Sequence, residues 1–62
     1  MPKVRDAIRR VRDDGWIHDR TNGSHRIYVH PEKPSIVVIA GHPGEEMQMS
    51  MWQQIMKQAG LR

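Results

Sequence analysis

The sequence of 62 residues predicts an α+β fold of two layers, with elements in the order α-β-β-β-α. Three observations lead to this prediction. Apolar residues recur at helical spacing near both ends of the chain. Three runs of strand length lie between them, and the first two flank an Asn-Gly pair, which is a strong hairpin signal. We therefore expect a three-stranded antiparallel sheet with both helices on one face and solvent on the other.

Residues 2–15 are predicted to form the first helix. Its apolar residues recur at the spacing of a single helix face: Val4, Ala7, Ile8 and Val11. Arginines occupy the remaining faces, so the helix is amphipathic. Gly15 follows an acidic pair and suits the left-handed residue that commonly ends a helix.

The runs 16–20 and 25–30 are predicted to pair as a β-hairpin across the TNGS turn, because both Asn and Gly tolerate positive φ. Residues 35–40 then supply a third strand. Its continuous apolar character favours burial or a central position over an exposed edge.

Side chains alternate between the two faces along a strand, and this sets which residues of the second strand meet the helices. His25, Ile27 and Val29 project to one side of the strand and Arg26, Tyr28 and His30 to the other, and we expect Ile27 and Val29 to face the helices. Arg26 and Tyr28 are then expected on the solvent face, where the tyrosine ring would be free to stack on a base.

The last helix is predicted to begin at Ser50, because Gln53 three residues later completes a capping box. Gly60 followed by Leu61 predicts a Schellman ending. Trp16 and Trp52 are interpreted as core anchors. The methionines around the start of this helix exceed what so small a core can take up, so part of them is expected at the surface, where methionine suits an adaptable protein contact: Met47, Met49, Met51 and Met56.

Composition narrows the function classes. The chain has no cysteine, which excludes disulfides and thiolate zinc sites and favours a reducing cytoplasm. The longest apolar run, 36–40, is far too short to span a membrane, and no signal peptide is visible. The net charge is +3, and residues 1–31 hold the whole excess, with seven Lys/Arg against four Asp/Glu. A basic half makes a polyanion such as nucleic acid a natural partner.

His25 opens the second strand directly after a glycine turn, where its ring is expected to be open to solvent. A histidine ordinarily titrates near pH 6.5, which suits proton transfer at neutral pH. From the residues alone, a lone histidine in a turn is more often an ordinary surface residue than a catalyst. The other histidines have no tight zinc-ligand spacing, so we predict no metal site, although one of them could pair with His25 as a second acid or base: His18, His30 and His42.

Four short strings resemble one known family over nearly the whole chain. They are DGW at 14–16, R-x-x-GSH at 20–25, HP at 30–31 and KQAGL at 57–61. Together they resemble the HicA toxins, small bacterial ribonucleases of toxin–antitoxin pairs with a double-stranded-RNA-binding-domain-like fold. The resemblance implies one HicA-like domain over residues 1–62, a HicB-like antitoxin as partner, and His25 as the catalytic histidine.

RNA carries its own nucleophile, the 2′-hydroxyl, so a ribonuclease of this kind needs only a base, an acid and cations. We therefore predict metal-independent cleavage of mRNA in the cytoplasm, with no small-molecule cofactor and no membrane partner. His25 is the expected base or acid, and Arg20 or Arg26 steadies the phosphate. Gly23, Ser24 and Tyr28 complete the predicted substrate-binding set, although turn geometry is the better explanation of Gly23. A non-catalytic RNA-binding module and a pure protein-interaction domain are the alternatives.

Overall fold

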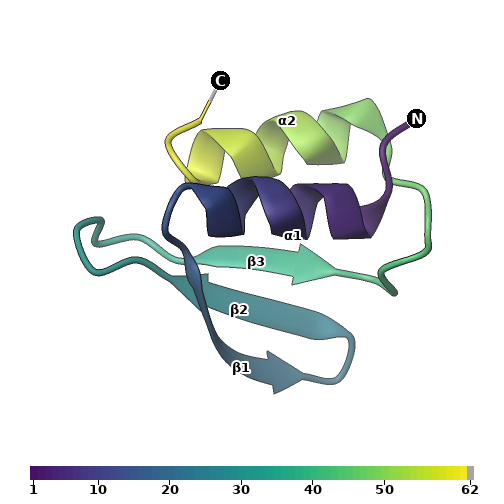
Figure 1. Ribbon diagram of the computed structural model, residues 1–62. Helices are drawn as coiled ribbons and strands as arrows, with labels where there is room; N and C mark the ends of the chain where they lie inside the picture. Colours follow the sequence, from purple (N-terminus) through teal and green to yellow (C-terminus); the bar gives the residue numbers. More distant parts are fainter. Residues whose placement is uncertain (62) are drawn as a thin grey trace.

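The computed structural model describes residues 1–61; Arg62, the last residue of the predicted domain, lies outside the described residues. The elements are α1 (Val4–Asp13), β1 (Ile17–Asn22), β2 (His25–Val29), β3 (Val37–Ala40) and α2 (Met49–Gln58). The strands form one antiparallel sheet in the order β1-β2-β3. Both helices lie on the same face of this sheet (Figure 1). The predicted fold class is confirmed.

Helix α1 begins and ends through local hydrogen bonds. The Asp6 carboxylate accepts the Lys3 backbone N–H at 2.8 Å, which satisfies a donor that the first turn leaves free. At the other end Gly15 has φ +100°, and the Trp16 N–H donates to the Val11 carbonyl at 3.1 Å. The predicted glycine ending is confirmed.

Helix α2 begins one residue earlier than predicted. The Met47 N–H donates to the Pro2 carbonyl at 2.7 Å, which holds the chain extended as far as Gln48. The helix starts directly afterwards, so Ser50 lies inside the first turn and the predicted Ser50 cap was wrong. The Schellman ending is confirmed, because Gly60 has φ +75° and the Leu61 N–H donates to the Met56 carbonyl at 2.7 Å. Within residues 1–61, neither helix is long and apolar enough to cross a bilayer.

Strand β3 lies at the edge of the sheet and β2 at its centre, so of the two expectations for residues 35–40, burial is confirmed and a central position is not. This burial comes from the helices, because both of them pack against β3. Val37 and Ile39 are fully buried on that side, while Val38 is half-buried and Ala40 exposed on the other.

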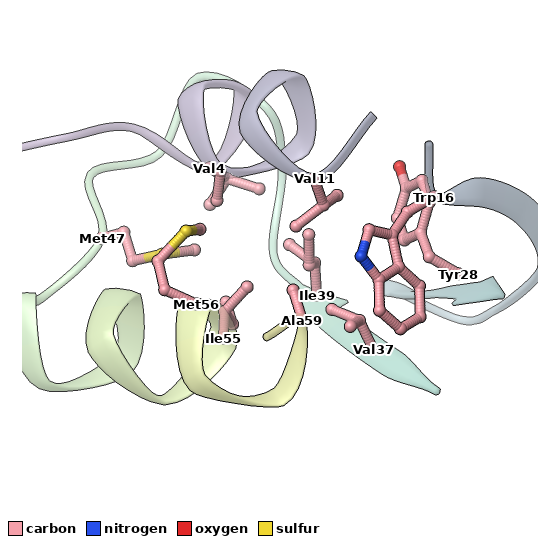
Figure 2. Close-up of a cluster of buried hydrophobic side chains, with 11 residues drawn as sticks. Val4, Val11, Trp16, Tyr28, Val37, Ile39, Met47, Ile55, Met56 and Ala59 are labelled. Atoms are coloured by element: carbon pink, nitrogen blue, oxygen red, sulfur yellow. The ribbon is translucent and has the colours of Figure 1, made fainter. Parts of the chain in front are cut away.

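The core lies between the helices and the sheet (Figure 2). Trp16 is buried in it as predicted, and Trp52 is half-buried and packs against it. Two methionines, Met47 and Met56, fill part of the core, whereas Met49 and Met51 stay half exposed at the start of α2. The expected surplus of methionine at the surface is therefore confirmed. The buried residues are Val4, Ala7, Val11, Trp16, Tyr28, Val37, Ile39, Met47, Ile55, Met56 and Ala59.

Candidate active site at the hairpin tip

The β1–β2 turn has Gly23 and Ser24 at its centre, because Asn22 and His25 are still paired across the hairpin. Gly23 has φ +63°, and no residue other than glycine in residues 1–61 has positive φ. Positive φ at the first central position alone is the type II′ arrangement, which calls for glycine there. The predicted hairpin is confirmed, but its turn lies one residue later than the Asn-Gly pair indicated. A Cβ on Gly23 would meet no atom within 4 Å. Glycine is therefore required here by the backbone conformation and not by a lack of space for a side chain.

His25 is exposed at the first position of β2. Its cross-strand partners are Asn22 on β1 and Ala40 on β3. Tyr28 is buried against the helices, so the alternation along β2 places His25 on the opposite, open face of the sheet. The imidazole is exposed, as predicted, but the prediction grouped His25 with Ile27 and Val29, which were expected to face the helices, and that choice of face was wrong.

A β-bulge in β1 brings Arg20 to the same open face. The pairing register shifts between His18 and Arg20, so that His18 pairs with Tyr28 while Arg20 pairs with Ile27. Without the extra residue, His18 and Arg20 would share a face. Arg20 now lies diagonally across the hairpin from His25. It forms an ion pair with Asp19, but its side chain is 64% exposed and remains free to meet a phosphate.

Arg26, the other predicted phosphate contact, lies on the helix side of the sheet. Its Nη1 donates to the Gly41 carbonyl at 2.8 Å. The Gly41 N–H in turn donates to the Ser24 carbonyl at 3.2 Å, which fixes the loop after β3 beside the GSH turn. Of the two predicted arginines, the structure therefore brings only Arg20 to the face that His25 occupies.

Tyr28 does not face solvent. Its side chain is only 2% exposed and points into the core with Val37 and Ile39 (Figure 2). Burial raises the pKa of the Tyr28 hydroxyl. The predicted orientation of β2 was therefore wrong, and Tyr28 is not placed to stack on a base. The strand carries apolar residues on both faces, and the larger aromatic side chain is the one that the helices cover.

The remaining histidines occupy different surroundings. His18 is exposed, shares a hydrogen bond of 2.7 Å with the Thr21 hydroxyl, and meets the Tyr28 ring edge-on. His42 is exposed in the loop after β3, where its backbone N–H donates to the Glu45 carboxylate at 2.9 Å. Because that loop is tied to Ser24, His42 belongs to the His25 end of the sheet. Within residues 1–61, no three His, Asp or Glu side chains are grouped so as to hold a metal ion.

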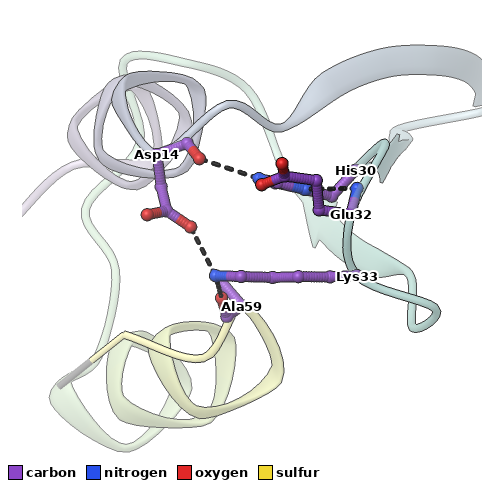
Figure 3. Close-up of polar contacts among 5 residues, drawn as sticks. All are labelled: Asp14, His30, Glu32, Lys33 and Ala59. Atoms are coloured by element: carbon purple, nitrogen blue, oxygen red, sulfur yellow. Dashed lines mark hydrogen bonds and ion pairs between the residues drawn. The ribbon is translucent and has the colours of Figure 1, made fainter.

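His30 belongs to a structural cluster at the other end of β2 (Figure 3). Its Nε2–H donates to the Asp14 carbonyl at 2.9 Å, and its Nδ1 accepts the Glu32 N–H at 3.0 Å. Lys33 joins the same cluster by donating to the Asp14 carboxylate at 2.6 Å and to the Ala59 carbonyl at 2.8 Å. These contacts tie the C-terminal ends of both helices to the loop after β2. Both ring nitrogens of His30 are used in the fold, so it is a poor partner for His25.

The Asp14–Lys33 pair makes part of the stability dependent on pH. The hydrogen bond from Lys33 lowers the pKa of Asp14 below its ordinary value of 3.8. Because the pKa of Asp14 is lower in the folded state than in the unfolded state, its ionised carboxylate stabilises the fold. This stabilisation is complete above about pH 4 and is lost as the pH falls through the lowered pKa. We expect Asp14→Asn to lower the melting temperature at pH 7 and to converge on the wild type in acid. Thermal melts from pH 7 to below pH 4 measure this.

Asp13→Asn is the matched control, because Asp13 is exposed and forms no ion pair within residues 1–61. Its removal also relieves a negative charge near the helix C-terminus, so it is expected to leave the melting temperature unchanged or slightly raised. Equal melting curves for the two variants at both ends of the pH range would contradict the role given to Asp14.

A comparison with protein families identifies the chain. The model of the family described as "HicA toxin of bacterial toxin-antitoxin" matches residues 4–61. The chain belongs to the HicA toxin family. The match runs from the start of α1 to the Schellman ending of α2, so in this HicA toxin the GSH turn and the loop after β3 both lie inside the family domain. No curated protein matches the chain.

Proposed function

We propose that this HicA toxin is a metal-independent endoribonuclease that cleaves mRNA, with His25 as its acid or base. The observation that carries the proposal is the placement of His25, exposed on the open face at the hairpin tip with Arg20 beside it, in a chain of the HicA family. Exposure matters because the scissile phosphate of a long RNA has to reach the imidazole without the chain entering a closed pocket.

The chemistry needs only groups that the chain can offer. A base removes the proton of the RNA 2′-hydroxyl, and the 2′-oxygen then attacks the adjacent phosphorus. The bond from phosphorus to the 5′-oxygen breaks, and an acid donates a proton to that leaving oxygen. The products are a 2′,3′-cyclic phosphate and a free 5′-hydroxyl, so atoms and charge balance without a co-reactant.

Arg20 supplies the cation for this step. Negative charge builds on the phosphoryl oxygens as the 2′-oxygen attacks, and an exposed guanidinium on the same face as His25 stabilises it. The turn residues Gly23 and Ser24 border the same site, and the open space above Gly23 leaves room for the RNA backbone.

His42 is the best candidate for the second acid or base. It follows Gly41, whose N–H is bonded to Ser24, so the fold holds this loop at the His25 end of the sheet. His18 faces the helix side near Tyr28, and His30 has both nitrogens occupied. Loss of His42 should then remove one limb of the pH–rate profile, whereas loss of His18 should leave both limbs in place.

Membership of a toxin–antitoxin family implies an antitoxin partner. We propose a HicB-like protein that covers His25, and we place both proteins in the bacterial cytoplasm, where mRNA is found. The half-exposed Met49 and Met51 at the start of α2 supply adaptable apolar surface for such a contact.

The test is incubation of the purified protein with a labelled RNA in EDTA. Cleavage that leaves a 2′,3′-cyclic phosphate supports the proposal, and a 2′-deoxy nucleotide at the scissile position should abolish it. Binding that weakens with salt, without cleavage, would favour the alternative of a non-catalytic RNA-binding module. No affinity for RNA would leave a protein-interaction domain.

A further inference from the structure

Three arginines of α1 form a basic sector, which we define as Arg5, Arg9 and Arg12. At about 100° of rotation per residue they lie within roughly 60° of one another around the helix axis. All three are exposed, and together with Ile8 and Asp13 they line a shallow groove on the surface of α1. Their spacing along the axis is about 6 Å and then about 4.5 Å.

No ion pair within residues 1–61 involves this sector, although Asp13 lines the same groove. The ion pairs found within residues 1–61 join Arg20 to Asp19 and Lys33 to Asp14, and neither involves an arginine of the sector. The neighbouring Arg10 lies about 100° around the helix axis from Arg9 and therefore outside the sector, while Asp6 and Asp13 lie one turn before and after both residues.

The sector meets the projecting hairpin at one end. Its C-terminal end, Arg12, lines a second groove with Trp16, Ile17 and His18, and Figure 1 shows β1 extending away from both helices. Its N-terminal end is held at the loop after β3, because the Arg5 N–H donates to the Pro43 carbonyl at 3.0 Å. That loop is bonded to the GSH turn, so the sector begins at the end of the sheet where His25 lies.

We propose that the basic sector binds the phosphate backbone of single-stranded RNA, at a site separate from the cleavage site around His25. This inference rests on the proposed function and adds a substrate-binding surface to it. A row of exposed guanidinium groups that form no ion pair within residues 1–61 matches a row of phosphates. An acidic protein segment fits less well, because Ile8 is the only apolar residue lining the groove on α1 and it already packs against the core.

The test measures the affinity for a short fluorescein-labelled 2′-O-methyl RNA by anisotropy between about 50 and 200 mM salt. The methylated 2′-oxygen cannot attack, so binding is measured without cleavage. Arg9→Gln should weaken binding roughly two- to fivefold, as expected for one exposed ion pair. It should also reduce the slope of log K against log salt by about 0.7, and replacing all three arginines should reduce it by about 2.

Arg10→Gln is the matched control, because it removes the same charge from the next position of the same helix. Its slope should stay at the wild-type value. Equal slopes for Arg9→Gln and Arg10→Gln would overturn the basic sector as a binding site. The proposal would also be overturned if Arg9→Gln lost binding to a polyglutamate peptide but kept its affinity for RNA. That result would assign the sector to an acidic protein.

The same variants separate this inference from the proposed function. If His25→Ala still cleaved ordinary RNA while the slopes behaved as expected, the catalytic assignment would fail and the basic sector would stand. If cleavage depended on His25 but the slopes did not depend on Arg9, the catalytic assignment would stand and the basic sector would fail as a binding site.

Discussion

Replacing His25 by alanine is expected to reduce RNA cleavage by about 100-fold or more, since a positioned acid or base contributes roughly 10²- to 10⁴-fold. The free energy of unfolding should change by no more than about 0.5 kcal/mol, because the side chain is exposed at the hairpin tip. Initial rates on a labelled RNA in EDTA measure the first effect, and urea denaturation followed by circular dichroism measures the second.

His18→Ala is the control for this experiment. His18 is also an exposed histidine of the hairpin, but the bulge in β1 turns it to the helix side, away from the open face. Its removal should leave the rate of cleavage within a few-fold of the wild type. Comparable cleavage by the wild type and His25→Ala, with both proteins folded, would rule out the assignment of His25.

Replacing Tyr28 by alanine is expected to cost about 3 kcal/mol or more of stability, as truncation of a buried aromatic side chain usually does. A chain of this size has little stability to spare, so the variant should be largely unfolded near 37 °C. Tyr28→Phe keeps the buried ring and should fold normally. Thermal melts and urea titrations check both outcomes.

Ile27→Ala is the matched control on the same strand. Ile27 is half-buried on the open face, so the loss should be clearly smaller than for Tyr28→Ala. If Tyr28→Ala remained stable but lost affinity for RNA, the ring would be acting on the substrate, and its placement in the core would be contradicted.

The β1–β2 turn was only partly predicted by its local sequence. The sequence TNGS predicted a hairpin correctly, because the glycine is needed wherever the chain adopts positive φ. It did not decide between the central pairs Asn22-Gly23 and Gly23-Ser24, since a two-residue turn can be centred on either pair. The choice is made with the third strand, through Ala40 opposite His25 and the Gly41 N–H that bonds to Ser24.

The orientation of β2 was predicted wrongly for a similar reason. Ile27 and Val29 on one face and Tyr28 on the other are all able to enter a core, so alternation alone leaves two solutions. Pairing with β3 selects one of them, because Tyr28 lies opposite Val37 on the side that the helices cover. The error affected the predicted site. It placed Tyr28 on the substrate side of the sheet, and it did not show that Arg20, and not Arg26, shares a face with His25.

The sequence by itself determined the order of the elements, the glycine endings of both helices, the hairpin and the position of His25 beside its turn. These features depend on hydrogen bonds and backbone angles within a few residues, which short sequence patterns encode. Only the tertiary structure decided that the bulge in β1 sets Arg20 on the face of His25, that Arg26 lies on the opposite face, and that the basic sector borders the open hairpin. Each of these depends on which face of the sheet the helices cover, and contacts between segments distant in the chain fix that choice.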